Sequence, residues 1–205
     1  MANEIERVEP PALPLAPEEY RRPFMDQNSN VLRLFFNRLI NSVNTLLSTD
    51  DGGKFLYMPR GLFYSTTDQT AAVINTGYPV EFENTYIESK ISIVDDTKIT
   101  VSADGVYNFQ VTLQTAHTNS AAVQAWTWIN KNGTDVTYGG QQQTIVGNAN
   151  QPVYWNFSID LTAGQYIEMY WATADLSLSL DSTAPTSPHP GIPSAVVAVS
   201  FVSNL

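Results

Sequence analysis

Residues capable of nucleophilic or acid–base chemistry are few in this chain. The only histidines are His117 and His189, and there is no cysteine. Ser194 follows Gly191-Ile192-Pro193, so it lacks the second glycine that a strained nucleophile turn requires. We therefore expect neither a catalytic triad nor thiolate chemistry.

Two pairs of adjacent carboxylates, Asp50-Asp51 and Asp95-Asp96, are the other candidates for acid–base work or for binding a cation. Adjacent side chains on an extended backbone point to opposite faces, so the members of a pair do not converge on one site. We interpret both pairs as turn residues. Gly139-Gly140-Gln141-Gln142-Gln143 lacks the Gly-Lys-Ser/Thr of a phosphate-binding loop and indicates an exposed turn. We expect no enzymatic activity, no metal site and no cofactor.

Aromatic residues are the one group that suggests ligand binding. Trp126 and Trp128 are two positions apart and share one face of a predicted strand. In a β-sandwich such residues usually fill the core or line an axis between subunits. The alternative is an aromatic platform that contacts a glycan. The candidates are Trp126, Trp128, Tyr154, Trp155, Tyr170 and Trp171.

The charge of the chain argues against nucleic acid as a partner. Its 205 residues include 20 acidic and 10 basic residues, for a formal net charge of −10. Binding a phosphate backbone requires clustered Lys and Arg, yet after Arg60 the only basic residues are Lys90, Lys98 and Lys131. No apolar run reaches membrane-spanning length, and the first residues do not form a secretory signal, so we expect no membrane insertion.

The elements that carry these residues are predicted to be strands from residue 51 onward. Short segments of alternating apolar and polar residues are separated by Gly, Asn, Asp and Pro, which is typical of a sandwich or barrel. Lys131-Asn132-Gly133-Thr134 predicts a type I′ hairpin turn, because Asn-Gly accepts positive φ values. We predict strands over 54–58, 61–65, 70–75, 86–94, 97–102, 105–115, 121–130, 143–146, 153–161, 165–172 and 195–202, and a Pro-rich loop over 180–193. The fold class is mainly β, with one sandwich domain over 51–205.

Residues 1–27 are predicted to form an extended arm. Five prolines within the first 23 positions disfavour helix and central strand. The arm is either a disordered tail or a peptide that orders against another protein, and we favour docking because its apolar residues exceed what a spacer needs. These residues are Ile5, Val8, Leu13, Leu15, Tyr20 and, just beyond the prolines, Phe24.

Residues 28–50 are predicted to form an amphipathic helix. Its apolar residues recur at spacings of three or four, and Asn28, Ser29 or Asn30 can cap its start. The stripe either packs on the helix's own domain or forms a short coiled coil between identical chains, and both interpretations stay open. It consists of Leu32, Phe35, Leu39, Val43 and Leu46.

Three sequence phrases resemble the jelly roll of the complement and tumour-necrosis-factor-like superfamily. They are Asp104-Gly105-Val106-Tyr107-Asn108-Phe109, residues 126–136 with the Lys-Asn-Gly turn, and Leu161-Thr162-Ala163-Gly164-Gln165-Tyr166-Ile167-Glu168. With the closing Pro193-Ser194-Ala195-Val196-Val197, the later phrases also resemble virion proteins of tailed bacteriophages. The resemblance implies a jelly-roll sandwich and a homotrimer packed about a three-fold axis. Gln165 stands where that pattern often has aspartate, which removes one cation ligand.

These observations give two main hypotheses for function. The first is a non-enzymatic virion structural protein, a trimeric short fibre, knob or decoration protein that binds other virion proteins through its arm and helix. The second is an adhesin or receptor-binding module whose loops around 139–143 and 183–190 recognise a host surface glycan. The residue types described above argue against a third, an esterase-like or metal-dependent enzyme.

Overall fold

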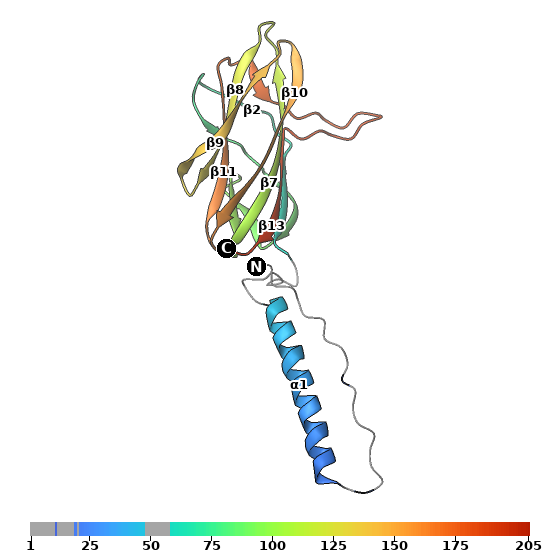
Figure 1. Ribbon diagram of the computed structural model, residues 1–205. Coiled ribbons are helices and arrows are strands. Elements are labelled where there is room, and N and C mark those ends of the chain that lie inside the picture. Colours follow the sequence, from blue (N-terminus) through green and yellow to red (C-terminus); the bar gives the residue numbers. More distant parts are fainter. Residues whose placement is uncertain (1–10, 12–18, 20, 48–57) are drawn as a thin grey trace. The chain divides into compact units, whose positions relative to one another are not determined.

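The structure, a computed structural model, describes residues 11, 19, 21–47 and 58–205 (Figure 1). These residues belong to two compact units, a helical N-terminal unit and a β unit. The arm residues Ile5, Val8, Leu13, Leu15 and Tyr20 lie outside the described residues, as do Asp50 and Asp51.

One helix, α1 (Arg22–Leu47), forms the described part of the first unit. It begins earlier than the predicted start at residue 28, because the amide nitrogens of Phe24 and Met25 donate to the carbonyl oxygen of Arg21 at 3.1 and 3.2 Å. Pro23 fits in this first turn, where a helix needs no amide donor. Phe24 therefore belongs to the helix and not to an extended arm. Asn30, predicted as a cap, lies inside the helix, and its Oδ1 accepts a hydrogen bond from Arg33 at 2.6 Å.

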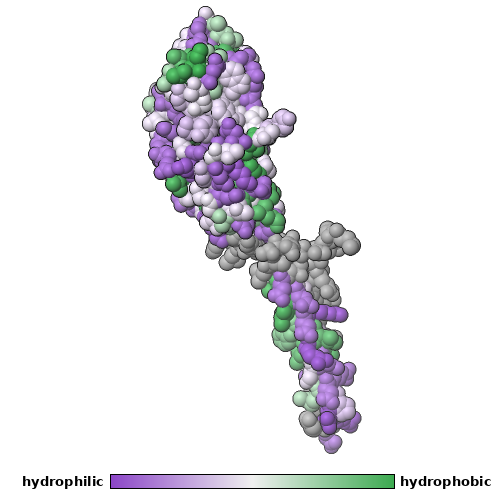
Figure 2. Space-filling model, turned by 90° about the vertical axis from the view of Figure 1, so that its left-hand side faces the viewer, coloured by the Kyte–Doolittle hydropathy of each residue, from purple (hydrophilic) through white to green (hydrophobic). Residues whose placement is uncertain are grey.

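The apolar stripe of α1 is broader than predicted. At about 100° per residue, Phe36 and Ile40 widen the predicted stripe, and their side chains are 52% and 54% exposed. Figure 2 shows hydrophobic and hydrophilic surface side by side along this helix. The side chain of Leu46 lies outside the described residues. The other predicted stripe residues are half-buried or exposed: Leu32, Phe35, Leu39 and Val43.

The β unit consists of two antiparallel sheets, called sheet A and sheet B (Figure 1). Sheet A contains β1 (Arg60–Ser65), β2 (Gln69–Thr70), β4 (Asn84–Ser89), β7 (Gly105–His117), β10 (Ala149–Leu161), β12 (Leu178–Leu180) and β13 (Ala195–Ser203). Sheet B contains β3 (Tyr78–Pro79), β5 (Ile91–Val94), β6 (Lys98–Val101), β8 (Val123–Lys131), β9 (Thr134–Ile145) and β11 (Tyr166–Thr173).

The path of the chain through these sheets is that of a jelly roll. In sheet A, β10 pairs with β7, and β13, β1 and β4 follow on the other side of β7. In sheet B the order is β5-β6-β11-β8-β9. From β7 onward the chain alternates between the sheets, with β7 in sheet A, the β8–β9 hairpin in sheet B, β10 in sheet A, β11 in sheet B, and β12 and β13 in sheet A; β5 and β6 form a further hairpin within sheet B. The predicted fold class, a mainly β sandwich with one helix near the N-terminus, is confirmed.

The core lies between the two sheets and is largely aliphatic and aromatic. Phe109 of β7 stacks on Phe157 of β10, with ring centroids 5.0 Å apart. Tyr107 is buried as well, and its hydroxyl donates to the carbonyl oxygen of Ala103 at 2.7 Å. Burial, with a smaller contribution from Asp104, raises the pKa of this phenol to about 12. The largest fully buried side chains include Phe63, Phe82, Ile91, Ile99, Ile145, Leu161, Ile167, Met169, Leu178 and Leu180.

Two strand predictions, one turn prediction and one loop prediction need correction. Residues 139–143, predicted as an exposed turn, lie within β9, because an edge strand of an antiparallel sheet does not need a continuous apolar pattern. The predicted strand over 70–75 is reduced to β2. The predicted strand over 86–94 is divided at Lys90, whose φ is 58°. The short strand β12 falls where the loop over 180–193 was expected to start.

Two predicted turns are confirmed. Asn132 and Gly133, between β8 and β9, have φ values of 51° and 81°, which is the positive pair that a type I′ turn requires. Asp95 and Asp96 have φ values of 54° and 59° between β5 and β6, so they are turn residues. Within the described residues, no helix combines the length and apolarity needed to cross a membrane.

Candidate functional site

The six aromatic candidates occupy four different places in the β unit. Trp171 points into the core and is 2% exposed. Trp155 is half-buried and packs against the core, with its ring centroid 4.8 Å from that of Phe157. Tyr154, the preceding residue on β10, points away from the core on sheet A and is 67% exposed.

The other three aromatic candidates, Trp126, Trp128 and Tyr170, lie together on the outer face of sheet B, meaning the face turned away from sheet A. The burial of β8 alternates, so Trp126 and Trp128 share this face as predicted. Tyr170 is the partner of Trp128 on β11. The candidates do not form one cluster, because successive side chains on a strand point to opposite faces.

The outer face of sheet A, turned away from sheet B, carries two neighbouring rows without a charged residue. Each row is a set of cross-strand partners from β10, β7, β13, β1 and β4. Arg60 and Asp160 lie beyond one end of the rows, and the carboxylate of Glu83, just before β4, accepts a hydrogen bond from Asn84 at 3.1 Å. One row contains Tyr154, Thr112, Val196, Tyr64 and Asn84; the other contains Asn156, Gln110, Ala198, Leu62 and Ile87. Depletion of charge with retained tyrosine is typical of the centre of a protein interface.

A pocket of about 350 Å³ lies beside Tyr64, at the base of a hairpin between β12 and β13. In this hairpin Thr183 and Ile192 exchange backbone hydrogen bonds of 2.8 Å, and Thr186 pairs with His189. The hairpin projects from the β unit (Figure 1). The Pro-rich segment is therefore paired and ordered, where the sequence predicted only a loop. The pocket lining is uncharged and includes Tyr64, Thr66, Ala184, Pro185, Ile192 and Pro193.

The indole of Trp128 is held on the outer face of sheet B by several contacts. Its ring stacks on that of Tyr170, with centroids 5.6 Å apart and an interplanar angle of 25°. Its Nε1 donates to Oδ1 of Asp135 at 2.9 Å, and Asn130 Nδ2 donates to the same oxygen at 3.2 Å. Gly77 lies so close that a Cβ there would be 2.7 Å from the ring. These contacts hold the indole in one orientation.

Polar side chains continue this face beside Trp126. Gln142 of β9 is the partner of Trp126, and its Nε2 donates to Gln124 Oε1 at 2.7 Å. Gln124 Nε2 in turn donates to Thr144 Oγ1 at 2.9 Å. Figure 2 views the β unit from the side on which β9 and β11 lie in Figure 1, and hydrophilic and near-neutral colours cover most of this side.

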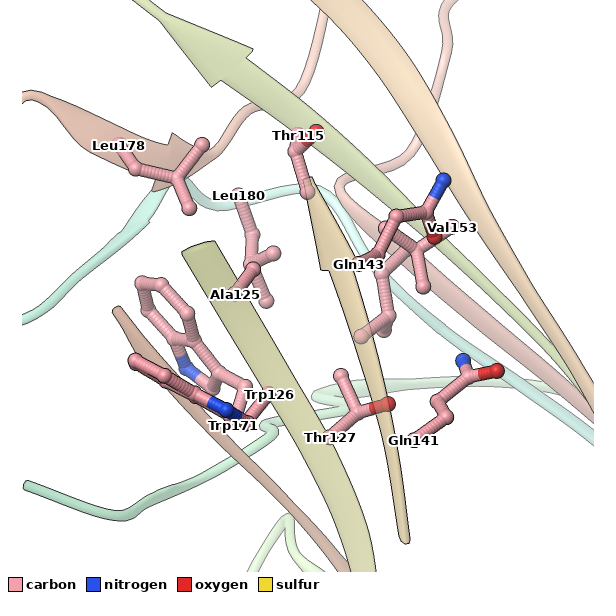
Figure 3. A pocket seen from close by; sticks show the side chains of 11 residues that line it. Thr115, Ala125, Trp126, Thr127, Gln141, Gln143, Val153, Trp171, Leu178 and Leu180 are labelled. Carbon is pink, nitrogen blue, oxygen red and sulfur yellow. The ribbon is translucent and has the colours of Figure 1, made fainter. Parts of the chain in front are cut away.

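A small cavity of about 10 Å³ lies between the sheets (Figure 3). It holds about one water molecule, so it is not a ligand site. Thr115 and Thr127 both line it. Thr115 Oγ1 donates to the carbonyl oxygen of Gln151 at 2.5 Å, whereas Thr127 Oγ1 is buried without a hydrogen-bond partner among the described residues.

Ser194 and His117, two of the residue types that could take part in catalysis, are both buried in the β unit. Ser194 is buried, and its Oγ donates to the carbonyl oxygen of Thr67 at 2.6 Å. His117 is buried at the end of β7, with Nε2 3.9 Å from Oδ2 of Asp175. The backbone amide of Ser177 and the side chain of Asn119 lower the pKa of Asp175 to about 2. Among residues 21–47 and 58–205, no three His, Cys, Asp or Glu side chains form a group that could hold a metal ion.

An ion pair joins the end of β8 in sheet B to β10 in sheet A. Lys131 Nζ of β8 lies 3.1 Å from Oδ2 of Asp160 on β10, and it also donates to the carbonyl oxygen of Asp160 at 2.7 Å. The hydrogen bond from Lys131 lowers the pKa of this carboxyl group. Because Asp160 is largely exposed, we assign the pair a minor role in stability.

Sequence reasoning missed the outer face of sheet A and the partners of Trp128. Tyr64, Val196 and Thr112 become neighbours only through strand pairing over long sequence separations. Asp135 belongs to the sequence phrase over 126–136 that resembles the jelly-roll family. Its hydrogen bond with Trp128, however, depends on the register of the β8–β9 hairpin. The type I′ turn was the available signal, since it places Asp135 opposite Asn130.

Comparison with known proteins adds no relative: no protein-family model matches the chain, and no curated protein is detectably similar to it.

Proposed function

We propose that this chain is a non-enzymatic structural protein of a virion, a trimeric knob, short fibre or decoration protein. The observation that carries the proposal is the uncharged outer face of sheet A. Exposed sheet faces of monomers usually carry charged residues, whereas this face presents Leu62, Tyr64, Val196 and Ala198 in adjoining rows. Such a face is suited to contact with another copy of the chain.

The arrangement of this face favours head-to-tail contact. Tyr154 protrudes at the β10 end of one row, and the pocket beside Tyr64 lies near the other end of the same row. A projecting side chain of one copy can then enter the pocket of the next. Contacts of this type close into a ring when the rotation between copies permits it. Three copies is the number that the resemblance of the sequence phrases suggests.

The helix and the arm supply the proposed attachment to other virion proteins. A helix that is apolar over a wide sector needs a partner surface, and Phe36, Leu39, Ile40 and Val43 of α1 are exposed. The virion assignment itself is supported by the resembling phrases over residues 126–136 and 161–168. Burial of an apolar arm side chain supplies about 1.5–3 kcal/mol before ordering costs, so a few such residues suffice for docking.

Mass in solution tests the self-association. We expect light scattering to give three times the 22.7 kDa of the chain. Val196→Lys places a charge in the middle of the uncharged rows and should shift the protein to monomer. Thr100→Lys, on the outer face of sheet B, is the matched control, since Thr100 is also half-buried on a strand. Circular dichroism establishes that both variants fold.

A monomeric wild type at micromolar concentration, or a Val196→Lys variant that folds and stays trimeric, would contradict the role of this face.

Deletion of residues 1–20 tests the attachment while leaving the carbonyl oxygen of Arg21 to accept the first helical hydrogen bonds. We expect a folded trimer that is absent from purified particles. Recovery of the truncated chain in particles at the full-length ratio would rule out anchoring by the arm.

A further inference from the structure

We propose that the outer face of sheet B binds a neutral saccharide, with the indole of Trp128 as the stacking surface and the carboxylate of Asp135 as an acceptor for sugar hydroxyls. This site lies on the sheet opposite to the proposed self-association face, so it does not depend on the proposed function.

The aromatic residues of this face are not used by the core. Trp126, Trp128 and Tyr170 are half-buried, and none belongs to the hydrophobic core cluster of the described residues or to the side chains packed against it. Trp155 and Trp171 do belong to one of those groups. These side chains are therefore suited to contact a ligand or a partner that lies on the sheet.

Each of the two indoles has one small cross-strand neighbour. The partner of Trp128 on β9 is Gly140, and the partner of Trp126 on β11 is Ala172. Residues two apart on a strand are about 6.5–7 Å apart, so the two indoles lie in a line that can contact adjacent rings of an oligosaccharide. Because Tyr170, Asp135 and Gly77 already fix Trp128, little side-chain entropy is lost when a ligand stacks on it.

The polar groups beside the rings match sugar hydroxyls. Asp135 is exposed, and its Oδ1 accepts from Trp128 and Asn130, whereas its Oδ2 has no hydrogen-bond partner among the described residues. At the other end of the line, beside Trp126, Gln142 and Gln124 supply amide groups that both donate and accept. A pyranose combines an apolar C–H face with hydroxyls around its rim, which is the combination that this face can satisfy.

The charge and the ring geometry distinguish a neutral saccharide from two other ligands. Asp135 and Glu168 are carboxylates on this face, so an anionic sugar or a phosphate would be repelled. A quaternary ammonium ion is bound by rings that surround it, whereas Trp128 and Tyr170 lie nearly parallel and in contact.

Nuclear magnetic resonance of the full-length protein tests the proposal through its four tryptophan side chains. The probes are methyl β-glucopyranoside, methyl β-galactopyranoside, cellobiose and lactose, with sialic acid and tetramethylammonium as charged comparisons. We expect saturable shifts of the Trp126 and Trp128 indole signals with at least one neutral probe, and unchanged Trp155 and Trp171 signals. The charged probes should leave all four signals unchanged.

Variants separate the site from the fold. Trp128→Ala should weaken binding of the responsive probe about tenfold or more, and Asp135→Ala should weaken it several-fold, with both proteins folded by circular dichroism. Trp128→Phe, which keeps a ring but loses the bond to Asp135, should retain part of the affinity. Tyr154→Ala removes an exposed aromatic from sheet A and should leave sugar binding unchanged.

The proposal is overturned if no neutral probe shifts the Trp128 signal at tens of millimolar, if tetramethylammonium shifts it instead, or if Trp128→Ala binds as the wild type does.

Discussion

At the scale of single residues, Thr115 and Thr127 show that two similar side chains in one cavity wall can differ in their effect on stability. Both hydroxyls are in the interior, but only that of Thr115 has a hydrogen-bond partner among the described residues. A buried polar group without a partner lowers stability, whereas a buried hydrogen bond contributes about 1 kcal/mol.

We therefore predict opposite results for two valine substitutions. Thr127→Val should leave the free energy of unfolding unchanged or raise it, because an unpaired hydroxyl is replaced by a methyl group of similar size. Thr115→Val should lower it by about 1 kcal/mol, because the carbonyl oxygen of Gln151 loses its donor. Urea unfolding of the two variants measures both values. An equal loss in both would mean that a water in the cavity satisfies Thr127.

Asp175 gives the β unit a dependence on acid pH. Its pKa is lowered to about 2 from the ordinary 3.8, chiefly by the backbone amide of Ser177 and then by the side chain of Asn119. A carboxyl group with a depressed pKa in the folded state stabilises the fold above its unfolded pKa, and this contribution disappears as the pH falls toward the folded value.

We predict that Asp175→Asn has a lower free energy of unfolding than the wild type at ~pH 5. This difference should shrink as the pH falls from 3.8 to about 2. Urea unfolding at a series of pH values measures the difference, and a carbon-13 titration measures the pKa directly. A midpoint at or above 3.8 for Asp175 would contradict the hydrogen bonds that hold the loop from β11 to β12.

At the scale of elements, a turn and a bulge together set the register of the β8–β9 hairpin. The turn uses Asn132 and Gly133 at positive φ and places Asp135 beside Asn130, whereas a shift in register between Trp128 and Asn130 places Gly140 beside Trp128. The proposed saccharide site therefore depends both on the two-residue turn and on this irregularity in the hairpin. The start of α1 is not set by a turn. Because Pro23 is compatible with the first turn of a helix, α1 begins at Arg22, before the predicted start at residue 28.

We predict that Gly133→Val lowers the free energy of unfolding by about 1–2 kcal/mol, because a β-branched residue resists positive φ. Gly133→Asn is the matched control and should lose much less, since asparagine tolerates this conformation. A Cβ at this position would be 3.6 Å from Tyr166 Oη, so crowding does not explain a loss. Equal stability of the valine variant and the wild type would show that the turn changes type.

At the scale of the whole molecule, the head-to-tail arrangement can be tested by cross-linking. Tyr64 and Tyr154 lie in one row of sheet A, separated by three strand spacings, or about 14 Å. A disulfide needs Cα atoms within about 7 Å, so cysteines at these positions cannot be bridged within one chain. The chain has no cysteine of its own, so any disulfide that forms involves the introduced cysteines.

We predict that the doubly substituted protein, Tyr64→Cys with Tyr154→Cys, forms disulfide-linked dimers and trimers on oxidation. Each single substitution should remain unlinked, because head-to-tail packing does not bring identical positions together. Non-reducing electrophoresis measures the products. Efficient linking of Tyr154→Cys alone would indicate a two-fold contact instead.

The sequence by itself determined the fold class, the presence of α1, most strand positions and the turn at Asn132-Gly133, because these follow from local periodicity and from φ preferences of single residues. The tertiary structure decided which side chains share a surface. Six aromatic candidates became a core residue, a half-buried edge residue, an exposed tyrosine on sheet A and a trio on sheet B, since the face of a residue is fixed by register and its neighbours by pairing. Tyr64, Val196, Thr112 and Tyr154 form one row only because β1, β13, β7 and β10 pair in that order, and the order of strands in a sheet comes from long-range packing that local sequence patterns do not encode.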